Sequence, residues 1–159
     1  MKKINLDSIN YLRSRVDFSK EELEEAIKTK ARAHSEPELK KADEEITRIE
    51  EWKARIEAKL AKYETEAEEA KELAEAGWEI ILAYVWLDDY GCRDSKVDRS
   101  MWHSVEEAEK AYHKIKKGNG NYIAAWIEVR EMGEFERIEN IYTRIEMLKA
   151  ELKELCVDD

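Results

Sequence analysis

The longest regular pattern in the chain is a series of apolar positions spaced three and four residues apart over residues 35–76. Its beginning carries Ser35, Pro37 and Glu38. These residues form a helix-start signal, because Ser and Glu can satisfy free amide groups of the first turn and Pro is tolerated there. No Gly or further Pro follows before Gly77. We therefore predict one helix over 35–76, roughly 60 Å long and with a packed seam.

A second apolar stripe covers residues 134–156, with three apolar positions in each heptad. When this stripe is run backward along residues 35–76, large side chains meet small ones, such as Tyr142 beside Ala67. Complementary sizes favour close packing. We therefore expect a long antiparallel, coiled-coil-like hairpin between 35–76 and 133–159.

The N-terminal segment, residues 1–34, is predicted to form a helical arm of two short helices. Asp7 or Ser8 can cap the first helix, and Ser19 with Glu22 forms a capping box that would begin the second. The predicted hairpin leaves half of the long helix uncovered, and we expect the arm to fold back onto that half.

Between these helical segments, residues 77–132 change to a pattern rich in β-branched and aromatic residues. It predicts strands at 78–87, 96–102 and 122–130, with a capped helix at 104–117 before the last strand. The order β-β-α-β indicates a small three-stranded head with one covering helix. The whole chain is therefore predicted to be an α+β protein.

The predicted head is rich in aromatic side chains, which supply a first candidate binding surface. Alternation along strand 122–130 puts Tyr122 and Trp126 on one face, and Ala125 and Ile127 on the face that suits the covering helix. The aromatic face is either covered by the root of the hairpin or exposed to a protein partner or planar ligand. The candidate contact residues are Trp86, Trp102, Tyr122 and Trp126, with Arg99 as a source of positive charge.

The chain is acidic, with 28 basic and 38 acidic residues and a net charge of −10. This charge argues against direct binding to nucleic acid, whose phosphates attract basic surfaces. Residues 64–75 of the long helix hold six Glu and only one basic residue, Lys71. That stretch is either a solvated face or a surface that occupies a basic groove in a nucleic-acid-handling partner. Its candidate contact residues are Glu64, Glu68, Glu69 and Glu72.

The sequence contains no recognisable catalytic, metal-binding or cofactor-binding motif. The three His have no metal-ligand spacing, and neither a phosphate-binding Gly-rich loop nor a nucleophile elbow is present. We therefore expect neither enzymatic activity nor a cofactor. Cys92 and Cys156 belong to opposite ends of the predicted hairpin, so we expect free thiols and a reducing, cytoplasmic setting. The longest uncharged apolar run, 80–87, is too short to cross a membrane.

The segment Arg99–Ala108 combines a strand that ends at Trp102 with a Glu-Glu-Ala helix capped by Ser104. This segment resembles a unit that is common in small proteins of phages and mobile elements. Short, acidic chains of this kind are similar to the counter-defence inhibitors of phages, including anti-CRISPR proteins. The resemblance implies a protein that acts by binding in the host-cell cytosol, and it assigns no role to an individual residue.

Together these features predict a non-enzymatic binding protein that blocks a larger, basic effector that handles nucleic acid. Two alternatives remain open: a sponge for a nucleotide signal, which would stack on the aromatic head, and a coiled-coil structural adaptor. A parallel homodimer of the long helix is disfavoured, because flanking residues such as Glu50 and Glu57 would lie near their own copies. An antiparallel homodimer, or one built through the head, remains open.

Overall fold

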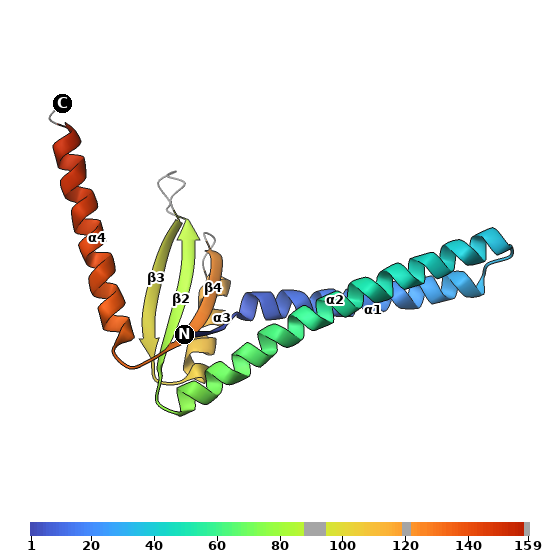
Figure 1. The fold of residues 1–159 in the computed structure, drawn as a ribbon, viewed down its shortest axis with the longest axis horizontal. Coiled ribbons are helices and arrows are strands. Elements are labelled where there is room, and N and C mark those ends of the chain that lie inside the picture. Colours follow the sequence, from blue (N-terminus) through green and yellow to red (C-terminus); the bar gives the residue numbers. More distant parts are fainter. Residues whose placement is uncertain (88–94, 119–121, 158–159) are drawn as a thin grey trace.

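The structure is a computed structural model that describes residues 1–87, 95–118 and 122–157. Within these residues the chain forms helices and one antiparallel sheet, so the predicted combination of helix and sheet is confirmed. Cys92, for which a free thiol was predicted, lies outside the described residues. In chain order the elements are β1 (Lys2–Ile4), α1 (Leu6–Ala31), α2 (Glu36–Glu75), β2 (Glu79–Leu87), β3 (Ser95–Trp102), α3 (Val105–Gly118), β4 (Tyr122–Arg130) and α4 (Glu134–Val157), as Figure 1 shows.

The sheet has four strands in the order β1-β4-β2-β3, and not the three predicted from the sequence. The additional strand is β1, which pairs with β4 so that Ile4 lies opposite Ile127. β2 lies between β4 and β3, with Ile80 opposite Val129 on one side and Trp102 on the other. A strand of only three residues is too short to show an alternating pattern, which is why the sequence did not reveal it.

One face of the sheet carries the main hydrophobic core. Ile80, Leu82, Ile127 and Val129 are buried there against helix side chains. The predicted contact between the aliphatic face of β4 and α3 is therefore confirmed. The buried helix residues of this core are Ile9 of α1, Ala67 and Ala70 of α2, and Ala108 and Tyr112 of α3.

α1 is one continuous helix, so the prediction of two short helices in residues 1–34 was wrong. Ser19, taken as the cap of a second helix, is fully buried inside α1 and donates its hydroxyl to the carbonyl of Val16 at 2.6 Å. The N-cap of α1 is Asn5, whose side chain accepts from the amide of Ser8. A capping pattern without an upstream helix breaker does not stop a helix, because the intrahelical hydrogen bonds can continue through it.

α2 follows the predicted long helix closely. Ser35 accepts from the amide of Glu38 at 3.3 Å, and the Glu38 carboxylate accepts from the amide of His34 at 2.9 Å. The helix ends at Glu75, and Gly77 follows with a left-handed φ of 97°, which favours glycine just beyond a helix end. Both ends of the longest element were therefore predicted correctly.

The expected packing of residues 1–34 against the outer half of α2 is confirmed, but the predicted partner of the other half was wrong: α1, and not α4, continues along it as an antiparallel hairpin (Figure 1). Leu12, Val16 and Ile56 form a buried cluster between the two helices. Lys30 pairs with Asp43 at 2.6 Å near the far end of the hairpin. From here on, the name arm refers to this whole α1–α2 hairpin and no longer to residues 1–34 alone.

α4 does not form the predicted antiparallel hairpin with residues 35–76. Among the described residues it makes no extended contact with another helix or strand, and it points away from the arm (Figure 1). Ala67, predicted to face Tyr142, is buried against the sheet core. The small alanines of α2 therefore allow close approach of the sheet, and the rest of the α2 seam is covered by α1.

Candidate interaction surface

The aromatic candidates do not form one exposed platform. Trp86, Trp102 and Tyr122 lie on the core side of the sheet, where Trp102 and Tyr122 pack against the hydrophobic core. The indole N–H of Trp86 donates to Asp98 at 2.9 Å. Only Trp126 lies on the opposite side of the sheet, so a stacking surface made of all four is not present.

Tyr122 was predicted to share a face with Trp126, and this prediction was wrong. The pairing of β2 with β4 shifts between Val85 and Trp86, so that the alternation along β4 is interrupted after Tyr122. Such an irregularity moves a side chain to the other face. Tyr122 consequently points to the core side, where its hydroxyl donates to Asp7.

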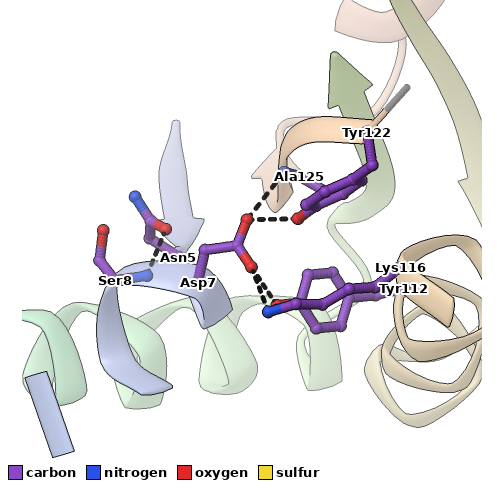
Figure 2. Close-up of polar contacts among 7 residues, drawn as sticks. All are labelled: Asn5, Asp7, Ser8, Tyr112, Lys116, Tyr122 and Ala125. Atoms are coloured by element: carbon purple, nitrogen blue, oxygen red, sulfur yellow. Dashed lines mark hydrogen bonds and ion pairs between the residues drawn. The ribbon is translucent and has the colours of Figure 1, made fainter. Parts of the chain in front are cut away.

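Figure 2 shows the polar cluster that Tyr122 joins, centred on the carboxylate of Asp7. One carboxylate oxygen accepts from Tyr112 and from Lys116 at 3.1 Å. The other accepts from Tyr122 and from the amide of Ala125 at 3.2 Å. The cluster thus ties the first turn of α1 to α3 and β4. We call it the Asp7 clamp.

The protonation of the Asp7 clamp follows from its contacts. Burial opposes ionisation of Asp7, but the bonds from Tyr112, Tyr122, Ala125 and Lys116 outweigh it and lower its pKa below the ordinary value. Burial and the Asp7 carboxylate raise the pKa of both Tyr112 and Tyr122. The carboxylate stays charged and its lone pairs are occupied. This arrangement suits a structural connection between elements better than proton transfer.

The sheet face opposite the core holds a second polar cluster. Glu128, Arg130 and Arg99 have side-chain exposures of 2%, 7% and 13%. Glu128 accepts from the indole N–H of Trp126 at 2.7 Å and pairs with Arg130. Lys3 lies 5.3 Å from the ring centroid of Trp126. Arg99 and Trp126, both predicted contact residues, are therefore brought together here, but Arg99 is largely buried.

Two of the four acidic candidates on α2 hold the N-terminal segment in place. Glu64 pairs with Arg13 of α1 at 3.0 Å, and Glu69 pairs with Lys2 of β1 at 2.6 Å. Glu68 pairs with Lys71 within α2 at 3.2 Å. Among the described residues, Glu72 has no ion pair. The acidic stretch is therefore partly neutralised by the chain itself.

α4 is fixed to the head at its beginning. The Glu79 carboxylate of β2 accepts from the amides of Gly133 at 2.9 Å and Phe135 at 3.2 Å, which are free first-turn groups. Two turns later, the Arg99 guanidinium lies 5.2 Å from the ring centroid of Tyr142. These contacts set the direction in which α4 leaves the sheet.

Beyond these contacts, α4 exposes more large apolar side chains than any other element in the described part of the chain. Ile141, Ile145, Leu148 and Leu152 are 49%, 40%, 52% and 61% exposed. An apolar row of this length on one helix is typical of a protein-binding surface, because its exposure to water is unfavourable. The sequence showed this row, but it was assigned to contacts within the chain.

Over residues 1–87, 95–118 and 122–157, no group of His, Cys, Asp and Glu is arranged to hold a metal ion. None of the helices searched there is both long enough and apolar enough to cross a membrane. Comparisons of the chain with protein families, curated proteins and solved structures find no match.

Proposed function

We propose that this chain is a non-enzymatic binding protein that acts by protein–protein contact, with α4 as a docking helix. The observation that carries this proposal is the exposed apolar row Ile141–Leu152 on a helix whose contacts with the head, as far as the chain is described, involve its first turns. Burying such side chains in an interface contributes about 25 cal/mol for each Å² of apolar surface. The sheet and the arm supply the rigid frame from which α4 extends.

The target that we propose is a basic protein that handles nucleic acid, as in the anti-CRISPR-like inhibitors of phages. The net charge of −10 supports this class of target, because complementary charge speeds association and selects partners. Glu68, whose ion-pair partner Lys71 lies in the same helix, and Glu72 are both exposed on α2. In this proposal the acidic arm meets the basic target, and α4 is a separate docking surface for a protein.

The proposal is tested with the full-length protein and a panel of purified, guide-loaded CRISPR nucleases. The measurement is cleavage of target DNA with and without the protein, at low and at physiological salt. Inhibition of at least one nuclease, weakened by salt, is the expected result. A panel with no inhibited member and no complex at low salt would contradict the proposed class of target.

Matched charge reversals show whether the acidic stretch of α2 is responsible. The variant Glu68→Lys/Glu72→Lys should weaken inhibition. The control Glu21→Lys/Glu24→Lys changes the net charge equally, at exposed positions in the outer part of the arm. Equal effects of the two variants would assign the inhibition to total charge instead of to this surface.

A second candidate function is a coiled-coil adaptor that joins like subunits. The exposed row on α4 favours it, because side chains spaced three and four residues apart are what a two-helix seam requires. Light scattering on the purified chain tests it, and a monomer at all accessible concentrations would reject it.

A further inference from the structure

We propose that α4 pairs with α4 of a second copy of this chain as an antiparallel two-helix coiled coil. This inference rests on the proposed role of α4 as a docking helix and names the occupant of that surface. Three features carry it: the spacing of the exposed row, its position relative to the head, and the charges that flank it.

The exposed row of α4 has the spacing of a coiled-coil seam. The half-buried Ile138 and the exposed Ile141, Ile145, Leu148 and Leu152 follow one another at intervals of three, four, three and four residues, so they occupy successive a and d positions. All five are branched aliphatic residues, the preferred type at these positions.

The seam is accessible to a second copy. At about 100° per residue, its centre lies roughly a quarter turn around the helix from Tyr142, the residue that contacts Arg99 of the head. Figure 1 shows α4 extending away from the sheet along its length. In an antiparallel pair the two heads would lie at opposite ends, because each α4 is attached to its own head at its beginning.

The flanking charges select the antiparallel orientation. Placing Ile145 opposite Leu148 of the second copy also places Ile141 opposite Leu152 of the second copy. In this register Arg144 lies beside Glu151 of the second copy. Because the dimer has two-fold symmetry, Glu151 also lies beside Arg144 of the second copy. On the other flank, Lys149 lies beside the ring of Tyr142 of the second copy, an arrangement that permits cation–π contact.

A parallel pair has the opposite charge pattern. Residues at g then lie beside residues at e of the following heptad, so Arg144 would lie beside Lys149 of the second copy. The symmetry again repeats the contact, giving two repulsive pairs. The same sequence therefore favours a second copy only when the two helices run in opposite directions.

The oligomeric state is measured on the full chain by sedimentation equilibrium, with a monomer mass of 18.8 kDa as reference. We expect a concentration-dependent dimer. Leu148→Asp, in the seam, should abolish it. Met147→Asp is the matched control, since Met147 is 62% exposed but lies on the side of α4 away from the seam, and its dimer should persist.

A charge reversal distinguishes the two orientations. Arg144→Glu turns both attractive pairs of the antiparallel dimer into repulsive ones, and we expect the dissociation constant to rise roughly tenfold. Arg144→Glu/Glu151→Arg should restore dimerisation. In a parallel dimer, Arg144→Glu would instead relieve repulsion from Lys149 and tighten association.

The results separate this inference from the proposed function. A monomer, a dimer unaffected by Leu148→Asp, or a dimer tightened by Arg144→Glu would overturn the antiparallel pairing. None of these results would remove nuclease inhibition by the intact protein. Conversely, a dimer with the expected variant pattern and no inhibited nuclease would support the pairing and reject the proposed target. Circular dichroism of each variant verifies that the helices are retained.

Discussion

Asp7 and Tyr122 lie 115 residues apart in the chain and are joined by a hydrogen bond from the tyrosine hydroxyl to the carboxylate. The same carboxylate accepts from Tyr112 of α3 and the amide of Ala125 in β4. The beginning of α1 is thereby attached to the head at the point where the arm leaves it (Figure 2). The Asp7 side chain therefore helps to set the orientation of the arm, together with the packing of Ala67 and Ala70 against the sheet.

Replacing Asp7 with Asn should destabilise the fold. The substitution removes the negative charge and leaves one acceptor oxygen for the donors around it, and we expect a loss of about 2 kcal/mol in the free energy of unfolding. Urea denaturation followed by circular dichroism measures the change. The control Asp17→Asn alters an exposed residue of the same helix and should change the free energy of unfolding by less than about 0.5 kcal/mol.

The contribution of Asp7 should also depend on pH. Its hydrogen bonds lower its folded-state pKa below the ordinary value of 3.8, despite the opposing effect of burial. The charged form is therefore favoured by folding, so its contribution is complete above pH 3.8 and is lost as the pH falls through the folded pKa. The stability difference between the wild type and Asp7→Asn should be constant near neutral pH and shrink below pH 3.8. A difference that grew on acidification would contradict this account.

Glycine at position 77 is required by the backbone and not by packing. Gly77 has a φ of 97°, and a Cβ added there would meet no atom within 4 Å. Gly77→Ala should therefore cost about 1–2 kcal/mol of stability through backbone strain alone. Gly118→Ala is the matched control, because its surroundings are equally open and no positive φ occurs there. Since Gly118 ends α3, that substitution should be neutral or stabilise the protein by up to about 1 kcal/mol in chemical denaturation.

Local patterns in the sequence identified most elements but not their partners. The bounds of α2 follow from Ser35, Glu38 and Gly77, which act within a few residues of themselves. The heptad spacing of α2 indicated a packed seam, but from the sequence only its outer half was assigned to residues 1–34 and the rest to residues 134–156. α1 fills it because it is longer than predicted, continuing through Ser19 without a break.

The candidate interaction surface was also predictable only where its pattern is local in the sequence. The exposed residues of α4 were visible as a broad apolar stripe, since their spacing is local. The Asp7 clamp left no such signal, because its contacts join residues 105 to 118 positions apart. The position of Tyr122 was missed for a related reason. A shift in strand pairing at Val85 and Trp86 depends on the assembled sheet and not on the alternation within β4.

The attachment of α4 to the head should depend on Glu79. Its carboxylate accepts from two first-turn amides of α4, and Glu79→Ala should reduce the stability of that turn by about 1 kcal/mol. Amide hydrogen exchange should become faster at the beginning of α4 and stay unchanged in α2. The control Glu136→Ala removes an exposed acidic residue from the same turn, without the two amide contacts, and should have a smaller effect. If the amides at the beginning of α4 exchanged equally fast in Glu79→Ala and Glu136→Ala, Glu79 would not be the residue that holds α4.

The strongest test of the arm compares two large-to-small substitutions. Ile56 is buried between α1 and α2 with an exposure of 9%, so Ile56→Ala should lower the free energy of unfolding by about 2–4 kcal/mol. Leu148 of α4 is 52% exposed, so Leu148→Ala should change the free energy of unfolding by less than about 0.5 kcal/mol at a concentration where the chain is monomeric. Both values come from urea denaturation under the same conditions.

If α4 instead packed along α2, Leu148→Ala would be strongly destabilising in the monomer. Removing residues 134–159 would then unfold the arm, whereas the structure requires the arm to keep its α1–α2 core without them.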